Sequence, residues 1–389
     1  MKTITVAVVG AGFAGDFHCK AFKKLGNVRF KIVMDVNIDR ANALKEKWGF
    51  EIACDDYESV LQDPEIDLVD IATPPAVHAD FSIRALDVGK HVISEKPLTG
   101  YFGQPEDEHP IGLKVSKKKM YEATLKELDA VKNAVNNSKA KFMYAENYIY
   151  SPAIVKAAEI LRAKKNRVLY SIGECRVHGS PSELSKLWKH VGGGSLLRLG
   201  AHPLSGVLYL KQIEAMAHGE NIKAISVTAD VGRTCVNLSE DERKHLLSNP
   251  VDVEDFANIV VTFSDGSKSI IFASDHTMGG IRNVIKMYCN DGVIECKMTI
   301  ADNMKTYFAN EEGLDGVYIS ENLRMKAGWN NVLVAEETLR GYLAQLAEFV
   351  ECAIENREPQ SGFALAYDTT KIIYAAYLSA EEGRRIDLN

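Results

Sequence analysis

The segment His91–Pro97 (HVISEKP) places a lysine where an apolar strand is expected to end. Pro97 pushes the preceding residue toward extended geometry and cannot itself continue a strand, so Lys96 should be displayed at the carboxyl end. An ammonium group there can anchor and polarise a ligand hydroxyl, because open parallel sheets bind their ligands at this edge. A solvated lysine at a strand terminus is the alternative interpretation.

A second candidate for chemistry lies in the segment Gly192–Pro203 (GGGSLLRLGAHP). Its three leading glycines allow the chain to turn close to a ligand, and the apolar run after them predicts a helix. Pro203 cannot donate to the carbonyl of Leu199, so the helix either kinks or begins again with His202 near its start. A helix start disfavours the imidazolium form and leaves a ring that can accept a proton. A structural histidine at a helix boundary is the alternative.

Near the N-terminus the sequence predicts a dinucleotide-binding turn. An apolar run over residues 3–9 leads into GAGFAG and then into a helical pattern. In this context the first glycine allows a tight turn, the second lets the backbone approach a pyrophosphate, and the third lets helix and strand pack closely. The predicted cofactor contacts of this turn are Gly10, Gly12, Phe13, Ala14 and Gly15.

Other residues are expected at the same edge of the sheet. Asp35 ends a second predicted strand, 20 residues after the last glycine, where a carboxylate binds the adenosine ribose and repels a 2′-phosphate. This favours NAD over NADP, with a plain turn residue as the alternative. Further predicted cofactor contacts, with a simple strand-to-helix turn as the alternative for the first three, are Thr73, Pro74, His78, Glu95 and Lys96.

The elements that position these residues alternate regularly between strands and helices. We predict strands over 3–9, 30–36, 50–54, 67–72, from 91 and over 141–146, and helices over 39–48, 57–61, 78–88 and 116–136. Such alternation with apolar strands is typical of a doubly wound parallel sheet. The sequence therefore predicts an α/β Rossmann domain over residues 1–147.

Beyond a junction at Ser151-Pro152, which can start a helix, strand-like runs follow one another. They cover residues 168–178, 222–233, 256–263, 268–275 and 281–289, with Asp265-Gly266 and Asp291-Gly292 as hairpin turns. We predict an α+β domain over residues 148–389 with a large, mainly antiparallel sheet. Helices expected over 336–355 and 366–382 would pack across the domain boundary.

Composition limits the possible partners. The chain has 389 residues, 46% of them hydrophobic, and a net charge of −7 without a basic face, which argues against nucleic acid. No apolar run approaches the roughly 20 residues that span a bilayer, and no signal peptide is expected before the first strand. Seven scattered cysteines without a C-x-x-C pair predict reduced thiols, no metal site and a cytoplasmic location.

Four motifs in this order, GAGFAG, ATPPAVH, SEKP and GGGSLLRLGAHP, resemble the glucose-fructose oxidoreductase, inositol dehydrogenase and rhizopine-catabolism (Gfo/Idh/MocA) family. The resemblance implies an NAD(P)-dependent dehydrogenase acting on CH–OH groups, a sugar, glycoside or cyclitol substrate, and a homodimer or homotetramer formed through the C-terminal sheet. It also implies a catalytic pair of Lys96 and His202. Dehydrogenases of the family typically carry aspartates at the positions of Arg198 and Ser205, and this chain has neither.

From the motifs and the resemblance we expect hydride transfer between a secondary ring hydroxyl and NAD, giving a keto-sugar, with a glucoside 3-dehydrogenase as the leading candidate. Lys96 would hold the hydroxyl, His202 would take its proton, and Tyr148, His178 and Arg198 would contact the substrate. A redox-assisted glycosidase or sugar isomerase with tightly bound NAD, and a non-catalytic NAD-binding regulator, are the alternatives. Arg198 could equally form a structural ion pair. Trp188 could stack on a sugar ring or pack in the core. Residues 100–116 are expected to form an extra loop over the cofactor edge.

Overall fold

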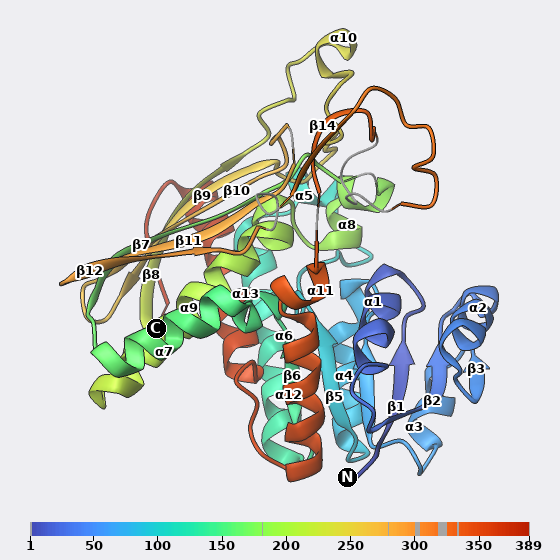
Figure 1. Ribbon diagram of the computed structural model, residues 1–389. Helices are drawn as coiled ribbons and strands as arrows, with labels where there is room; N and C mark the ends of the chain where they lie inside the picture. Colours follow the sequence, from blue (N-terminus) through green and yellow to red (C-terminus); the bar gives the residue numbers. More distant parts are fainter. Residues whose placement is uncertain are drawn as a thin grey trace. The chain divides into compact units, whose positions relative to one another are not determined.

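The structure, a computed structural model, describes residues 2–180, 182–278, 280–299, 304–317, 325–332 and 334–388. The chain divides into two compact units, which Figure 1 shows coloured along the sequence. Unit 1 comprises Met1–Phe102, Lys118–Tyr150 and Gly341–Lys371, and unit 2 comprises Gly103–Lys117, Ser151–Arg340 and Ile372–Asn389. The chain passes from one unit to the other near the predicted junction, between Tyr150 and Ser151.

Unit 1 is built on a sheet in which every pair of neighbouring strands is parallel, in the order β3-β2-β1-β4-β5-β6. Its strands are β1 (Ile4–Val9), β2 (Val28–Met34), β3 (Ile52–Cys54), β4 (Leu68–Ile71), β5 (His91–Glu95) and β6 (Phe142–Ala145). Every residue of β1 and β4 is buried, as apolar strands covered on both faces require. The predicted doubly wound parallel sheet is confirmed.

The helices of unit 1 follow the strands along the chain. They are α1 (Phe13–Phe22), α2 (Ile38–Trp48), α3 (Tyr57–Gln62), the 3₁₀ turn η1 (Pro75–Val77), α4 (His78–Asp87), α6 (Lys117–Asn137), the 3₁₀ turn η2 (Asn147–Tyr150), α12 (Tyr342–Glu355) and the first half of α13 (Phe363–Glu382). Side-chain caps start two of them, with Asn37 accepting from the first N–H groups of α2 and Asp56 doing so for α3. Helix α12 packs on α1, where the rings of Phe17 and Tyr342 lie 4.7 Å apart.

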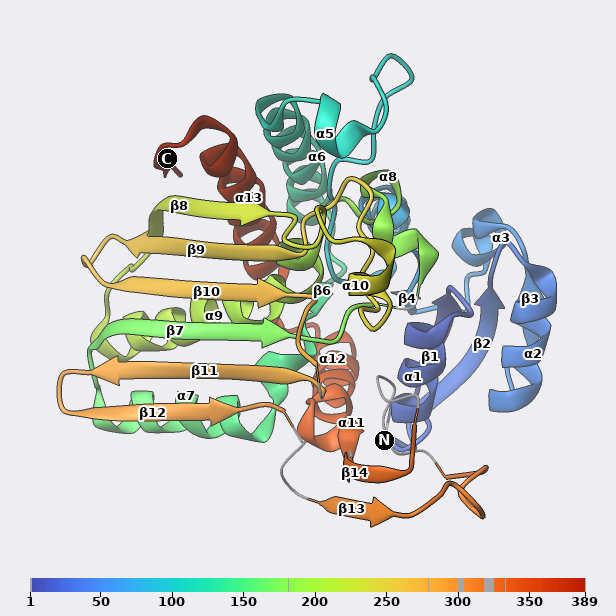
Figure 2. The same ribbon diagram turned by 90° about the horizontal axis from the view of Figure 1, so that it is seen from above.

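Unit 2 carries a sheet in the order β12-β11-β7-β10-β9-β8-β15, which Figure 2 shows with its strands side by side. Its strands are β7 (Val168–Arg176), β8 (Ala224–Gly232), β9 (Phe256–Phe263), β10 (Lys268–Ser274), β11 (Arg282–Cys289), β12 (Gly292–Lys297) and β15 (Ile386–Asp387). The pair β7–β10 is parallel and the other described pairs are antiparallel. This confirms the predicted mainly antiparallel sheet, and both predicted hairpin turns join adjacent strands. A separate ribbon pairs β13 (Lys305–Phe308) with β14 (Gly328–Asn331).

One face of this sheet is covered by helices. The helices of unit 2 are α5 (Ile111–Lys114), α7 (Pro152–Lys164), the 3₁₀ turn η3 (Glu183–Lys186), α8 (Trp188–Val191), the π-helical turn η4 (Leu196–Gly200), α9 (Ala201–His218), α10 (Glu240–Arg243), α11 (Glu336–Leu339) and the end of α13. Helix α9 lies so close to β7 that a Cβ on Gly173 would sit 2.9 Å from the Pro203 side chain. Buried and half-buried residues alternate along β9, as expected for a sheet covered on one face.

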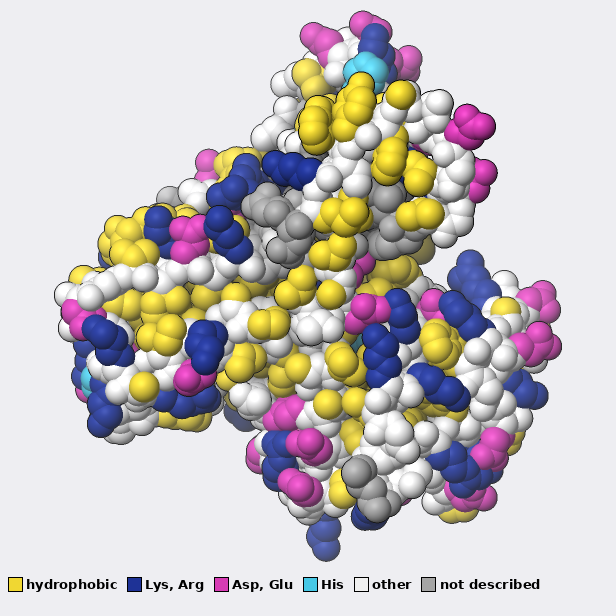
Figure 3. Space-filling model, viewed as in Figure 1, with side chains coloured by type: hydrophobic (Ala, Val, Ile, Leu, Met, Phe, Trp, Pro, Cys, Tyr) yellow, Lys and Arg dark blue, Asp and Glu magenta, His cyan; other side chains and the backbone are white. Residues whose placement is uncertain are grey.

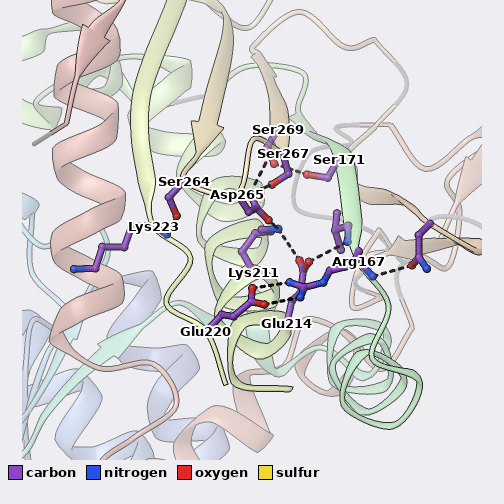
Figure 4. A network of polar contacts seen from close by, with 12 residues as sticks. Arg167, Ser171, Lys211, Glu214, Glu220, Lys223, Ser264, Asp265, Ser267 and Ser269 are labelled. Carbon is purple, nitrogen blue, oxygen red and sulfur yellow. Dashed lines mark hydrogen bonds and ion pairs between the residues drawn. The ribbon is translucent and has the colours of Figure 1, made fainter. Parts of the chain in front are cut away.

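A buried ionic network anchors the C-terminal half of α9 to the sheet (Figure 4). The ammonium group of Lys211 lies 2.6 Å from Glu214 Oε2 and 2.8 Å from Asp265 Oδ2 in the β9–β10 turn. Glu214 also accepts a hydrogen bond from the backbone N–H of Val168, at the start of β7. Since α9 carries His202 in its first turn, this network helps to fix the helix that positions a predicted catalytic residue.

One prediction about the chain's course needs correction. The single helix expected over 336–355 is broken into α11 and α12 because Gly341 adopts a φ of 91°, which a continuous helix does not allow. The insertion at Gly103–Lys117 belongs to unit 2, where the backbone N–H of Gly112 donates to Asp252. Within the described residues, no helix is both long and apolar enough to cross a membrane.

Candidate functional site

The glycine-rich turn of unit 1 has the geometry that its sequence predicts. Gly10 has a φ of 109°, and a Cβ there would lie 2.4 Å from the carbonyl oxygen of Ala72. A Cβ on Gly15 would lie 2.0 Å from the carbonyl oxygen of Gly10, so the close approach of α1 to β1 requires glycine. A Cβ on Gly12 would meet no atom within 4 Å, which leaves open space at the N-terminus of α1. The turn can therefore receive a pyrophosphate against backbone N–H groups.

Asp35 fixes the adenosine side of this turn. Its Oδ2 atom accepts a hydrogen bond of 2.8 Å from the backbone N–H of Ala11, and its Oδ1 atom accepts one of 2.9 Å from Asn37. Asp35 therefore does more than end a strand, since it ties the end of β2 to the glycine-rich turn. A carboxylate so held keeps oxygen lone pairs for ribose hydroxyls.

A cavity of about 470 Å³ runs along the ends of β1, β2 and β4. It is lined by Gly10, Gly12, Met34, Asp35, Val36, Arg40, Ala72, Thr73, Pro74, Ala76, Val77 and Phe81. Its apolar walls and the carboxylate at one side fit an adenosine with its ribose. Arg40 was not predicted as a site residue, although its place in the first turn of α2 puts it beside Asp35.

Lys96 directly follows the last residue of β5 and is half-buried. Its backbone N–H donates a hydrogen bond of 2.9 Å to Oε2 of Glu95, so the Glu95 side chain folds back over the strand end. The structure thus displays the lysine at the carboxyl edge of the parallel sheet. The same hydrogen bond holds the Glu95 side chain at this strand end.

Behind Glu95 lies a buried histidine that sequence reasoning missed. His18 on α1 is fully buried, with Nδ1 2.9 Å from Asp70 Oδ2 on β4 and Nε2 3.3 Å from Glu95 Oε1. Burial lowers the pKa of His18, but the carboxylates of Asp70 and Glu95 outweigh it and raise the pKa to about 10. The ring is therefore an imidazolium at neutral pH. Although burial raises the pKa of Glu95, His18 and Lys96 hold it below its ordinary value.

His78 braces the neighbouring strand ends and is itself buried. Its Nδ1 lies 2.7 Å from the carbonyl oxygen of Pro97, and its Nε2 lies 2.8 Å from that of Thr73. Burial lowers the pKa of His78, so the ring is neutral and can donate to only one of these carbonyls at a time. Thr73 and Pro74 line the cavity, whereas His78 contacts the backbone of the turns that follow β4 and β5.

The triple-glycine turn of unit 2 packs against protein atoms. A Cβ on Gly193 would lie 2.4 Å from the Tyr377 hydroxyl, and one on Gly194 would lie 1.9 Å from the carbonyl oxygen of Glu254. The carboxylate of Glu254 accepts from the N–H groups of Gly194 and Leu196 and from the Tyr377 hydroxyl, at 2.8–2.9 Å. The interpretation that these glycines approach a ligand is corrected for Gly193 and Gly194, where close packing explains the residue.

His202 does not begin a new helix. The π-helical turn Leu196–Gly200 runs directly into α9, and His202 is the second residue of that helix and buried. A wider turn suits this position because Pro203 has no N–H to bond the carbonyl of Leu199. Contrary to the prediction from the sequence, His202 therefore does not lie at a free helix start.

Arg198 forms an ion pair within unit 2. Its Nη1 and Nη2 atoms lie 2.9 and 3.4 Å from the two carboxylate oxygens of Asp275, just after β10. Asp275 is 3% exposed and Arg198 18%, so the pair is largely removed from water. Of the two roles considered for Arg198, the structure displays the ion pair.

The remaining predicted substrate residues are spread over both units. Tyr148 lies buried in η2 of unit 1, while His178 follows β7 in unit 2 and its Nε2 lies 3.0 Å from the carbonyl oxygen of His245. Trp188 is buried, with its ring 4.9 Å from that of Tyr377, which matches the core-packing interpretation.

Among the described residues, one group of side chains has the composition of a metal site: Cys235, Asp255 and His276, whose ligand atoms lie within 4.8 Å of one another. Both oxygens of Asp255 already accept hydrogen bonds, Oδ1 from Thr234 and Oδ2 from the thiol of Cys235. His276 Nε2 also lies 2.9 Å from Oδ2. These donors occupy both carboxylate oxygens of Asp255. Asp255 thereby connects the 234–235 turn to the ends of β9 and β10.

Comparison with known proteins finds a family that the N-terminal part of the chain matches. Residues 4–107 match the family model GFO_IDH_MocA, described as an oxidoreductase family with an NAD-binding Rossmann fold. Over residues 4–107 the chain is similar to the Gfo/Idh/MocA family. This confirms the resemblance seen in the sequence and makes the protein an oxidoreductase. The match also indicates that unit 1 is an NAD-binding Rossmann unit, which the open space at Gly12 and the cavity beside Asp35 fit.

Similar proteins include several named dehydrogenases. Levoglucosan dehydrogenase of Pseudarthrobacter phenanthrenivorans is 24% identical over 332 residues, 80% of this chain and 78% of that protein. The NAD(+)-dependent scyllo-inositol 2-dehydrogenase of Bacillus subtilis is 36% identical over 97 residues, 25% of this chain and 28% of that protein. Myo-inositol 2-dehydrogenase of Thermotoga maritima is 32% identical over 94 residues, 24% of this chain and 28% of that protein.

Solved structures share the fold of this chain over its full length. GenD2 from gentamicin A biosynthesis, in complex with NAD, gives a TM-score of 0.79 at 22% identity and covers all of this chain and 97% of its own. Levoglucosan dehydrogenase in complex with NADH and L-sorbose gives a TM-score of 0.74 at 21% identity over the whole of both chains.

Proposed function

We propose that this protein is an NAD-dependent dehydrogenase that moves a hydride between a secondary ring hydroxyl of a sugar, glycoside or cyclitol and the nicotinamide, giving a keto-sugar. Oxidation of a glucoside at C3 is the leading candidate. The observation that carries the proposal is Lys96, held by Glu95 at the carboxyl end of β5 in the NAD-binding unit. The names of relatives that act on levoglucosan and on inositols support the substrate class.

In this proposal Lys96 anchors the reacting hydroxyl. Its ammonium group donates to the hydroxyl oxygen and stabilises the negative charge that develops there as the proton leaves. NAD, when bound, supplies the acceptor for the hydride. Positive charge from Lys96 serves the role that a metal ion serves in other dehydrogenases.

His202 takes the proton of that hydroxyl. Its imidazole is the proposed general base, carried on the first turn of α9, and α9 is held by the π-helical turn on one side and by the Lys211 network on the other. Arg198 and His178 of unit 2 and Tyr148 of unit 1 are proposed to bind the rest of the ring.

A substrate screen tests this proposal. The protein is incubated with NAD or NADP and with levoglucosan, D-glucose, methyl β-D-glucoside, myo-inositol or scyllo-inositol, while NADH absorbance is followed and products are identified by NMR. We expect NADH to form in step with a ketone from at least one compound, and faster with NAD than with NADP. Cleavage or isomerisation without net NADH would indicate the redox-assisted alternative. Absence of any reaction would favour a non-catalytic regulator and contradict the proposal.

We also infer a homodimer or homotetramer formed through the outward face of the unit 2 sheet. Half-exposed apolar side chains meet in register across three strands of this face, where Ile270 on β10 pairs with Ile172 on β7 and with Val260 on β9. Figure 3 shows apolar side chains among lysines and arginines in the region of these strands. Light scattering should give a dimer or tetramer mass for the wild type and a monomer mass for Ile172→Asp with Ile270→Asp; a wild-type monomer would contradict the inference.

A further inference from the structure

The strand end that displays Lys96 is backed by a line of buried charges running from β4 through α1 to β5. Asp70, His18 and Glu95 lie in that order, with ring-to-carboxylate distances of 2.9 and 3.3 Å. Glu95 Oε2 then accepts from the backbone N–H of Lys96 at 2.9 Å. Each contact lies within unit 1, and together they connect the helix that follows the glycine-rich turn with the proposed catalytic lysine.

We propose that His18 is a positioning residue for Lys96: its buried imidazolium holds Glu95 ionised and in place, and Glu95 in turn fixes the backbone of Lys96. This rests on the proposed function, in which Lys96 is catalytic.

Charge balance is the first argument. Asp70 and His18 have no exposed surface and Glu95 is 12% exposed, so an unbalanced charge here would be costly. Two carboxylates on either side of one imidazolium leave one negative charge, which the Lys96 ammonium can balance. Replacing His18 by a neutral residue would leave two acidic groups near each other without a buried cation. One of them would then take up a proton at neutral pH.

Alignment is the second argument. The His18 Nδ1 atom makes a hydrogen bond of 2.9 Å with Asp70 Oδ2, whereas its Nε2 atom lies 3.3 Å from Glu95 Oε1, a longer contact between opposite charges. Asp70 therefore sets the orientation of the ring, and the ring attracts Glu95 mainly by its charge. This predicts that the charge of His18, more than its shape, matters for Glu95.

Other groups face this line and bear on its titration. Lys96 adds positive potential at Glu95, and the neutral ring of His78 lies beside the turn after β5. Tyr144 on β6 lies close enough to both Glu95 and Glu146 to feel their charges, and Tyr342 on α12 lies 6.0 Å from the His18 ring centre. In wild type, His18 outweighs the effect of burial on Glu95, whose pKa lies below the ordinary range. Without His18, burial would raise the pKa of Glu95.

The test compares His18→Gln with wild type and with His91→Gln. His91 lies at the opposite end of β5, where its Nδ1 accepts from the backbone N–H of Lys141, so the control removes a histidine from the same strand without touching Glu95. Turnover is measured from pH 5 to pH 9 with levoglucosan or myo-inositol, whichever reacts faster, and NADH binding is measured by fluorescence. Thermal melting checks folding.

We expect His18→Gln to lower kcat about 100-fold at pH 6, the loss expected when a reacting group is misplaced by about 1 Å. The loss should shrink as the pH rises and Glu95 ionises, while KM changes little and His91→Gln behaves as wild type. Adding His18→Gln to Glu95→Gln should cost little more, because both changes break the same link.

A His18→Gln variant with wild-type kcat and an unshifted pH profile would overturn the inference. If His18→Gln does not fold, Asp70→Asn is used under the same criteria, since it removes the group that orients the ring. Lys96→Ala separates the two claims: full turnover by that variant would contradict the proposed function, whereas an inactive Lys96→Ala beside a normal His18→Gln would contradict only the role of His18.

Discussion

The two terminal nitrogens of the Arg198 guanidinium contact the two carboxylate oxygens of Asp275, at distances of 2.9 and 3.4 Å. Dehydrogenases that resemble this chain typically carry an aspartate at position 198. In this chain Arg198 lies in the π-helical turn, and its partner Asp275 directly follows β10. This ion pair joins the turn before α9 to the end of β10.

Removing the Asp275 carboxylate from this pair should destabilise the protein. Asp275→Asn removes a carboxylate that faces a largely buried guanidinium and should lower the free energy of unfolding by about 3 kcal/mol. Combining it with Arg198→Met should restore much of the loss, because the buried positive charge that Asp275 balances is then gone as well. Urea denaturation measures both variants, and Asp230→Asn on β8 of the same sheet serves as the control. Additive losses in the double variant would contradict a direct pair.

The Lys211 network predicts a second stability effect. Lys211→Met leaves the carboxylate of Glu214, which is fully buried, without its cation, and should lower the free energy of unfolding by about 3 kcal/mol. Lys223→Met, an exposed lysine near the same network, should change it by less than about 0.5 kcal/mol. Urea denaturation of both variants decides the matter, and equal effects would show that Lys211 does not anchor α9.

Glu254 predicts a pH dependence. Burial raises the pKa of this carboxyl to about 7, so between its unfolded value and pH 7 the folded protein holds a proton that the unfolded chain releases. Wild type therefore loses stability as the pH rises through this window, by roughly 1.4 kcal/mol for each unit of pKa difference. Glu254→Gln cannot titrate, so its stability relative to wild type should improve from pH 5 to pH 8. A difference that stays constant with pH would contradict this assignment.

Asp35 predicts the choice of cofactor. Asp35→Ser removes the carboxylate that faces the ribose side of the cavity and should lower kcat/KM for NAD about 10- to 100-fold, the value of a hydrogen bond to a charged group. Repulsion of a 2′-phosphate is lost at the same time, so the NAD to NADP ratio should fall. Asp39→Ser, an exposed acid in the first turn of α2, is the matched control. An unchanged ratio would mean that Asp35 only braces the turn to Ala11.

The parallel half of the fold could be predicted because its signals are local. Apolar strands, the GAGFAG turn and the proline after Lys96 each dictate their own geometry, and the structure places Gly10, Gly15 and Lys96 as those rules require. The hairpins of unit 2 followed from Asp265-Gly266 and Asp291-Gly292 for the same reason.

Pairings between distant segments could not be predicted. His18 lies at a buried position on the apolar face of α1. Its spacing in the sequence is that of an ordinary core residue. The available signal was Asp70, an acid inside a buried strand, since such a group needs a partner. Glu254 and Asp275 likewise become meaningful only when the sheet brings them to Gly194 and Arg198.

The most direct test of the account is the turnover of Lys96→Met with the best substrate of the screen, measured beside NADH binding. Lys126→Met, on the exposed side of α6, is the control. We predict that Lys96→Met still binds NADH but loses about 10²- to 10⁴-fold in kcat, the range for removing a group that assists proton transfer. Wild-type turnover by Lys96→Met would contradict the central claim that this lysine holds the reacting hydroxyl.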